Sequence, residues 1–349
     1  MKIAPVMRAM SASPDRFEQL LVHTGQHYDP RMSQIFFEEL ELPRPDVNLE
    51  VGSGSHTWQT AQVMLRVEPI LEEIRPDWVI VVGDVNSTLA SALVCGKLHI
   101  PLAHVEAGLR SFDRSMPEEI NRLLTDQIAS LLFTPSADGD ENLLREGVAP
   151  EEIHRVGNVM IDTLVKLLPK AEALWPGLRK KYDLERYVLV TLHRGFNVDR
   201  EDALREILAA LETVSREIPV FFPVHPRTRL RIAEFGLEPR ANGLSLLEPL
   251  GYLEFLALQK YAALVLTDSG GIQEESTYLG VPCLTVRPNT ERPVTITMGT
   301  NQLVACEREI LADRMRSRLG EEKPRPVAPP LWDGRAAQRI VEVFKGFDR

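Results

Sequence analysis

The chain has 349 residues, more than the limit of about 250 to 300 for one hydrophobic core, so we expect two domains. Its formal net charge of −10 argues against nucleic acid or an anionic membrane as the main partner, although a local pocket of His and Arg can still hold an anionic ligand. The spacing of the three cysteines, Cys95, Cys283 and Cys306, includes no CxxC pair, so we expect no disulfides and no metal site. No apolar run approaches about 18 residues, so we expect a cytoplasmic protein.

Short apolar runs alternate along the chain with longer amphipathic segments. The runs that predict strands are Gln19–His23, Trp78–Val82, Leu102–Val105, Ser130–Thr134, Tyr187–Thr191, Val220–Val224, Ala263–Thr267 and Pro282–Val286. The segments that predict helices are Thr57–Ile74, Ser87–Leu98, Glu118–Ile128, Asp138–Glu146, Arg200–Arg216, Leu253–Tyr261 and Arg335–Phe344. Strand and helix in alternation indicate βαβ units, so the expected fold class is α/β with two doubly wound, Rossmann-like domains facing a cleft.

The alternation forms two blocks that meet near Asn158–Trp175. We therefore expect an N-terminal Rossmann-like domain over residues 1–158 and a C-terminal one over residues 159–334. A Pro-rich segment, Glu321–Asp333, precedes the last predicted helix. Because such a segment acts as a spacer, we expect residues 335–349 to carry that helix back onto the N-terminal domain.

Polar residues collect where the predicted strands end, and ligands bind at the carboxyl ends of strands in open α/β sheets. They are Thr24-Gly25-Gln26-His27, Gly83-Asp84, Glu106, Gly157-Asn158, His193-Arg194, His225-Pro226 and Asp268-Ser269-Gly270-Gly271. Polar residues placed at random would not gather at strand ends in this way. The pattern therefore predicts a functional cleft.

The segment from Asp268 to Glu275 predicts an anion site. Ser269 is suited to cap a helix, Gly270 and Gly271 let backbone amides approach a ligand, and a helix N-terminus favours a diphosphate. One of the glutamates a turn later is placed to accept hydrogen bonds from ribose hydroxyls. The alternative is an ordinary capped turn in which the glutamates only complement the helix dipole.

Two further strand exits carry histidine. His193-Arg194 suits charge-assisted hydrogen bonds to phosphate, and its alternative is a histidine satisfied by the backbone beside a solvent-exposed arginine. His225, before a proline, is evenly balanced between the two interpretations.

The stretch from His104 to Arg122 is rich in charge. Glu106 stands just past a predicted strand and Glu118 in the first turn of a predicted helix, with Arg110 nearby, so a structural ion-pair network is one interpretation. With Asp84 at a neighbouring strand exit, three carboxylates would push their pKa values apart, which suits proton transfer in both directions without a metal. His104, inside its strand, is more typical of a satisfied core histidine.

Taken in order, these motifs resemble the non-hydrolysing UDP-N-acetylglucosamine 2-epimerases over nearly the whole chain. The matching segments are Thr24–His27, Gly83-Asp84, His104–Arg110, Pro117–Arg122, Gly157-Asn158, His193-Arg194, Pro223–Pro226, Leu266–Glu275, Thr290–Pro293 and Gly299-Thr300. The resemblance implies the glycosyltransferase-B fold, no cofactor, a homodimer and a part in polysaccharide synthesis. It also implies reversible inversion at C2 of UDP-N-acetylglucosamine to UDP-N-acetylmannosamine, by loss of the C2 proton, elimination of UDP and its re-addition.

The resemblance also implies roles for residues at matching positions. Asp84, Glu106 and Glu118 are the acid–base candidates, with His193 beside them. The substrate-binding set is Lys2, Arg110, His193, Arg194, His225, Ser269, Gly270, Gly271, Glu275 and Arg292, in which His193, Ser269, Gly270 and Arg292 hold the diphosphate and Glu275 the ribose. Two alternatives stay open: an epimerase of another UDP-2-acetamido sugar, and a UDP-sugar-binding protein without turnover.

The sequence departs from the family pattern in two places. Family members open with a strand and a Gly-Thr-Arg-Pro-Glu loop, whereas this sequence opens at Met1–Val6, inside the helix that follows, with Lys2 retained. Either the true start codon lies upstream, or the first sheet has a gap that leaves strand edges unpaired. Tyr28 stands where regulated bacterial members carry arginine, which argues against allosteric activation by UDP-N-acetylglucosamine.

Overall fold

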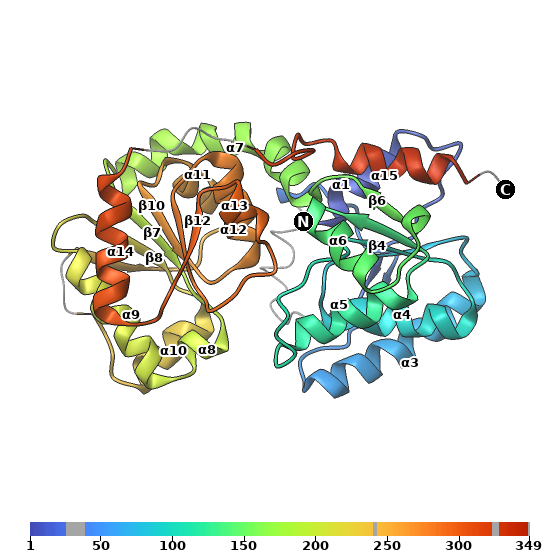
Figure 1. Cartoon of the computed structure of the whole chain (residues 1–349), viewed down its shortest axis with the longest axis horizontal. Coiled ribbons are helices and arrows are strands. Elements are labelled where there is room, and N and C mark those ends of the chain that lie inside the picture. The colour runs from blue at the N-terminus through green and yellow to red at the C-terminus, as the bar shows by residue number, and fades with distance from the viewer. Residues whose placement is uncertain (26–38, 240–242, 323–327, 348–349) are drawn as a thin grey trace. The chain divides into compact units, whose positions relative to one another are not determined.

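The computed structural model describes residues 1–25, 39–239, 243–322 and 328–347, and Figure 1 shows its elements. The chain divides into two compact units, one of Met1–Thr163 with Pro330–Arg349 and one of Leu164–Pro329. Each unit is built on a parallel sheet of its own. Gln26, His27 and Tyr28, on which two of the predictions depend, lie outside the described residues.

The first unit contains a four-stranded parallel sheet in the order β3-β4-β5-β6 and a separate parallel pair, β1-β2. Its strands are β1 (Val22–His23), β2 (Val47–Asn48), β3 (Val79–Val82), β4 (Leu102–Val105), β5 (Leu131–Thr134) and β6 (Ile153–Arg155). Its helices are α1 (Ile3–Ser11), α3 (His56–Ile74), α4 (Asn86–Leu98), α5 (Pro117–Ile128), α6 (Ala137–Arg145) and α15 (Ala336–Lys345). Among the described residues, β3 pairs within this sheet on one side only.

Helices cover both faces of this sheet, which explains why β4 and β5 are buried along their whole length. On one face, Val63 of α3 and Val94 of α4 pack into a core with Leu132. On the other face, Val6 of α1 and Ile340 of α15 pack into a second core. Figure 1 shows α1 and α15 on one side of the sheet and α3 and α4 on the other.

The last helix is anchored on the first unit by hydrogen bonds. The carboxylate of Asp162, near the start of α7 (Val159–Lys181), accepts from the backbone N–H groups of Ala336 and Ala337 at 3.0 and 2.7 Å. This caps α15 with a side chain from a distant part of the chain. The indole Nε1 of Trp332 also donates to the carbonyl of Pro135 at 2.9 Å.

The second unit contains a six-stranded parallel sheet in the order β12-β11-β10-β7-β8-β9. Its strands are β7 (Val188–Thr191), β8 (Val220–Pro223), β9 (Leu244–Leu247), β10 (Leu264–Thr267), β11 (Cys283–Val286) and β12 (Asn301–Val304). Its helices after α7 are α8 (Gly195–Val198), α9 (Glu201–Val214), α10 (Pro226–Glu234), α11 (Tyr252–Tyr261), α12 (Gly270–Leu279), α13 (Val294–Thr297) and α14 (Arg308–Gly320). The strand order reverses between β7 and β10, so the switch point at which such sheets bind ligands lies at the ends of these two strands.

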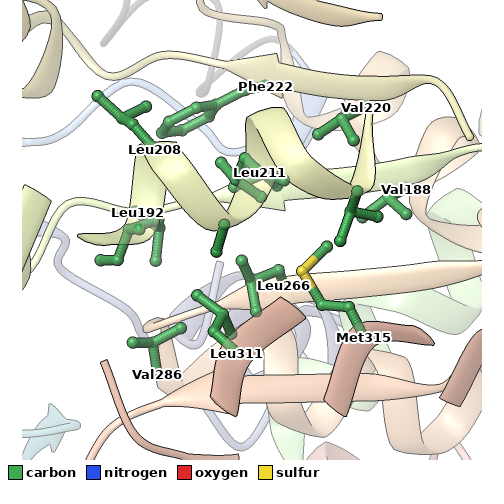
Figure 2. Packing of buried hydrophobic residues seen from close by; sticks show 14 of the residues in the cluster. Val188, Leu192, Leu208, Leu211, Val220, Phe222, Leu266, Val286, Leu311 and Met315 are labelled. Carbon is green, nitrogen blue, oxygen red and sulfur yellow. The ribbon is translucent and has the colours of Figure 1, made fainter. Parts of the chain in front are cut away.

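A tightly packed core holds those strands in place. Figure 2 shows Val188 and Leu266 of the sheet between Leu211 of α9 and Met315 of α14, and all four side chains are fully buried. Because cores of this kind have close to crystalline packing density, the ends of β7 and β10 are rigid supports for the residues that follow them.

The structure confirms the predicted α/β alternation, but several elements were missed. β6, β9 and β12 are edge strands, and the half-exposed sequences of β9 and β12, LSLL and NQLV, lack the continuous apolar run of a central strand. The long helix α7 was also missed because Pro169 and Pro176 interrupt its pattern.

Candidate active site

In the first unit, Glu106 lies directly after β4 and is paired with a lysine. Its backbone has a φ of +75°, an uncommon conformation for a residue with a side chain, and its amide donates to the carbonyl of Phe133 at 3.0 Å. The carboxylate is 3% exposed and forms an ion pair with Lys2 Nζ. A buried carboxylate is costly without such a partner, so the ion pair with Lys2 stabilises Glu106 at this strand exit.

The turn after β3 brings a second carboxylate to the same place. Gly83 has a φ of +70°, a conformation that favours glycine, and a Cβ there would lie 2.6 Å from Lys2 Nζ and 3.5 Å from Glu106 Oε2. The next residue, Asp84, accepts a hydrogen bond from Arg122 Nη1 at 2.5 Å. The turn therefore sets Asp84 close to the Lys2–Glu106 pair.

Helix α4, which follows this turn, begins without a side-chain cap. The N-cap residue is Val85, which makes no side-chain cap, and Asn86 instead donates to the side chain of Gln59 at 2.8 Å and contacts the ring of His56. The apolar side chain of Val85 gave no cap signal in the sequence.

The first turn of α5 carries two adjacent glutamates with different roles. Glu118 is half-buried, whereas Glu119 is buried and accepts from the amides of Ser111 and Phe112, both at 2.9 Å, and from Arg122. Burial alone would raise the pKa of Glu119, but the Ser111 amide and Arg122 hold it below its usual value. Glu119 therefore fixes the loop before α5, and no signal in the Glu-Glu pair distinguished it from Glu118.

Arg110 was predicted to bind substrate, and the structure assigns it to a buried ion-pair network instead. Its side chain is 1% exposed, and Nη2 lies 2.6 Å from Asp126 Oδ2 and 2.7 Å from Glu146 Oε2. Its Nε donates to Glu146 Oε1 at 2.8 Å. A guanidinium engaged on both edges and shielded from solvent has no free edge for a ligand, so we place Arg110 among the structural residues.

In the second unit, His193 and Asp268 meet at the switch point between β7 and β10. His193 Nδ1 lies 3.1 Å from Asp268 Oδ1, and the backbone amides of His193 and Arg194 donate to the same carboxylate at 3.1 and 2.9 Å. Burial would raise the pKa of Asp268, but His193 and the Arg194 amide hold it below its usual value. Asp268, which the sequence analysis did not rank as a site residue, therefore orients a histidine whose side chain is 40% exposed.

The N-terminus of α12 lies at the same strand end. Ser269 is the N-cap residue, as predicted, but its hydroxyl makes no cap hydrogen bond. A Cβ on Gly270 would overlap the guanidinium of Arg292, so the glycine allows that arginine to lie against the first turn, in which Gly271 is half-buried. Amide groups that no side chain caps, beside an arginine, favour an anion.

Arg292 belongs to a buried chain of alternating charges. It pairs with Glu274 through Nε at 2.8 Å and also with Glu291, which pairs with Arg287 at 2.7 Å. Two arginines and two glutamates give this group no formal charge. These ion pairs therefore fix the position of the Arg292 guanidinium over α12, but they add no net positive charge there.

Glu275 and His225 are also engaged within the second unit. The Tyr252 hydroxyl donates to Glu275 Oε1 at 2.8 Å, and burial raises the pKa of Glu275 to about 8. His225 accepts from the Arg227 amide at 3.2 Å as the N-cap of α10, and burial and His193 lower its pKa. The ring centroids of His193 and His225 are 6.3 Å apart, so both histidines lie at the same end of the sheet.

The predicted site residues thus form two groups. Lys2, Asp84 and Glu106 lie together in the first unit, and His193, Arg194, Ser269, Gly270 and Arg292 surround the end of β7 and β10 in the second. In the part of the chain that the structure describes, no cluster of three or more His, Cys, Asp or Glu residues is arranged to hold a metal ion. None of the described helices combines the length and apolar character that a bilayer span requires.

Comparison with known proteins identifies close relatives. The family model for UDP-N-acetylglucosamine 2-epimerase matches residues 8–345. The enzyme of that name from Methanocaldococcus jannaschii is 43% identical over 98% of this chain and 95% of its own length. Its crystal structure in complex with UDP-GlcNAc and UDP matches with a TM-score of 0.91 over 99% of this chain and 96% of that one.

A relative with a different substrate is nearly as similar. The UDP-2,3-diacetamido-2,3-dideoxy-D-glucuronate 2-epimerase of Pseudomonas aeruginosa is 42% identical over 93% of this chain and 91% of its own length. A Staphylococcus aureus MnaA–UDP structure, at 28% identity, matches with a TM-score of 0.90. These likenesses confirm the predicted fold class, two Rossmann-like units of the glycosyltransferase-B type.

Proposed function

This chain belongs to the UDP-N-acetylglucosamine 2-epimerase family, and we propose that it interconverts UDP-N-acetylglucosamine and UDP-N-acetylmannosamine. The observation that carries the proposal is the placement of Asp84 and Glu106 at neighbouring strand exits of the first unit, beside Lys2. Inversion at a carbon that bears hydrogen needs one group to take the proton and another to return it to the opposite face. Two carboxylates held close together suit that chemistry.

The reaction proceeds by elimination and re-addition. A carboxylate of the set Asp84, Glu106 and Glu118 takes the C2 proton, and the bond between C1 and the UDP oxygen breaks to leave 2-acetamidoglucal and UDP. UDP then adds back at C1 while a proton is delivered to the other face of C2. Lys2, ion-paired with Glu106, places a positive charge beside these carboxylates.

The second unit holds the nucleotide in this proposal. The diphosphate binds at the N-terminus of α12 against Ser269 and Gly270, where the amides carry no side-chain cap. His193, oriented by Asp268, hydrogen-bonds the diphosphate and supports its departure from C1. Glu275 lies one turn further along the helix and binds the ribose hydroxyls.

A second candidate substrate is UDP-2,3-diacetamido-2,3-dideoxy-D-glucuronate. It is favoured by the 42% identity to the Pseudomonas aeruginosa enzyme, which equals the identity to the Methanococcus maripaludis UDP-N-acetylglucosamine 2-epimerase. Both substrates present an acetamido group at C2 and UDP at C1, so the same acid–base chemistry serves either. The two substrates differ in the substituents at C3 and C6 of the sugar.

The purified chain is tested by following each UDP-sugar in turn by proton NMR. We expect UDP-N-acetylglucosamine to reach an equilibrium with UDP-N-acetylmannosamine that is the same from either direction. Faster turnover of the diacetamido uronate would favour the second candidate. Tight UDP binding without conversion of either sugar would contradict the proposal and leave a UDP-sugar-binding protein.

We further propose that the protein is a homodimer in the cytoplasm. Light scattering would test the oligomeric state, and cell fractionation would test the location.

A further inference from the structure

His104 lies in the middle of β4, and the reaction proposed above does not use it. Its side chain is fully buried, and both ring nitrogens have partners. Nδ1 lies 2.5 Å from Asp126 Oδ1 of α5, and Nε2 lies 2.8 Å from the carbonyl oxygen of Gly83. The ring therefore links three elements: the end of β3, strand β4 and helix α5.

The identity of the two partners fixes the protons on the ring. The Gly83 carbonyl is only an acceptor, so Nε2 must donate a proton to it. Asp126 is surrounded by donors, because its Oδ2 also accepts from the Gly108 amide at 3.1 Å and from Arg110 at 2.6 Å. The Gly108 amide and the Arg110 guanidinium favour the ionised form of this carboxylate. An ionised carboxylate is likewise only an acceptor, so Nδ1 must donate as well.

The surrounding charges accommodate a buried cation. Asp126 contacts both Arg110 and the ring of His104, and Glu146 contacts Arg110, so two carboxylates balance one guanidinium and one imidazolium. Beyond Gly83, the other charged groups are already paired, Lys2 with Glu106 and Arg122 with Asp84. A buried charge that is paired and hydrogen-bonded in this way is tolerated, whereas an unpaired one is not.

We propose that His104 is a positioning residue that stays doubly protonated and fixes the Gly83–Asp84 turn beside Glu106. Both backbone groups of Gly83 are held by β4, because its amide donates to the Val105 carbonyl at 3.0 Å and its carbonyl accepts from His104. Glu106 follows two residues after His104, directly past the end of β4. The imidazolium thus sets the spacing of two carboxylates on which the proposed epimerisation rests, and small displacements of reacting groups cost large factors in rate.

The first experiment reads the protonation of His104 without reference to activity. In ¹⁵N-histidine-labelled protein at about pH 7.5, an ordinary histidine is mostly neutral, with one ring nitrogen lacking a proton. We expect one histidine to show two protonated ring nitrogens, and we expect this signal to vanish in H104Q. A His104 signal with one unprotonated nitrogen would overturn the inference.

The second experiment separates positioning from binding. Glutamine replaces at most one of the two donor bonds, so we expect H104Q to lower kcat for C2 proton exchange by about 100-fold while KM and UDP affinity stay near wild type. H154Q is the matched control on strand β6, where the ring contacts Phe133, and we expect it to keep wild-type kcat. Wild-type kcat in a folded H104Q would overturn the inference.

If H104Q does not fold, D126N provides the same test, because it removes the charge that holds Nδ1–H. We expect D126N to lose the doubly protonated signal and to lower kcat as H104Q does, and an unchanged signal with unchanged kcat would overturn the inference. A wild-type chain without exchange would contradict the proposed function, while the nitrogen signal would still decide the protonation of His104.

Discussion

In the first unit, Asp84, Glu106 and Asp126 are each paired with cations of the same unit, whereas in the second unit the first turn of α12 has no side-chain cap. The first arrangement holds buried charges at fixed spacing with little net charge. The second leaves backbone donors and a partly exposed His193 available to an anion. This difference is the basis of the division of work that we propose, with proton transfer in the first unit and nucleotide binding in the second.

The two groups also differ in how they use glycine. Gly83 allows a turn to approach the Lys2–Glu106 pair, and Gly270 allows Arg292 to reach the start of α12. In the first case the glycine brings protein charges together, and in the second it clears space at a helix terminus. Substitutions in the first unit should therefore affect the rate of proton exchange, and substitutions in the second unit should affect UDP affinity.

The largest expected effect is on chemistry in the first unit. We expect E106Q to lower C2 proton exchange by about 10³-fold, because the amide cannot act as a base, while the affinity for UDP stays unchanged. Exchange is measured as deuterium uptake at C2 of UDP-N-acetylglucosamine in deuterated water. E141Q, a matched change on the 68% exposed Glu141 of α6, should leave exchange unchanged. Loss of UDP affinity in E106Q would break the comparison.

The buried ion pairs of the first unit should dominate its stability. R110M removes the buried guanidinium that Asp126 and Glu146 share, so we expect it to lower the free energy of unfolding by about 3–5 kcal/mol. R155M removes an arginine that is 41% exposed and paired with Asp140, and it should cost about 0–1 kcal/mol. Denaturant titration measures both. Equal losses of unfolding free energy in the two variants would show that burial does not determine how much an ion pair contributes to stability.

The anion site of the second unit is tested through Gly270. A methyl group there collides with Arg292 and displaces donors from α12, so we expect G270A to weaken UDP binding by roughly 10- to 100-fold in calorimetry. G177A is the matched control, since a Cβ at that helical glycine meets nothing within 4 Å. Unaltered UDP affinity in G270A would place the nucleotide elsewhere.

The smallest expected effect concerns Glu275. Its pKa of about 8 means that, from its ordinary value of 4.5 up to 8, the folded state holds a proton that the unfolded state has released. Stability therefore falls as pH rises through this window, by about 1 kcal/mol between about pH 6.5 and 7.5. E275Q should remove this dependence, measured as a smaller change in Tm across that step. E248Q, at a side chain 82% exposed, should keep the wild-type dependence.

The sequence predicted the central strands and the position of most candidate site residues at strand ends, because both depend on local signals. Fully buried strands such as β4 read as apolar runs, and Asp84, Glu106 and Ser269 follow such runs directly. The pairing of side chains did not follow from position, because the burial of Arg110 between Asp126 and Glu146 depends on α5 and α6 packing together. The same holds for Asp268, whose role appears only when β7 and β10 lie side by side.

The division of work between the units is tested most directly by measuring C2 deuterium uptake in E106Q and G270A side by side as UDP-N-acetylglucosamine is raised to saturation. We predict that E106Q stays slow at saturation, whereas G270A approaches the wild-type rate once enough substrate is present. Equal loss of the saturated rate in both variants would contradict the account.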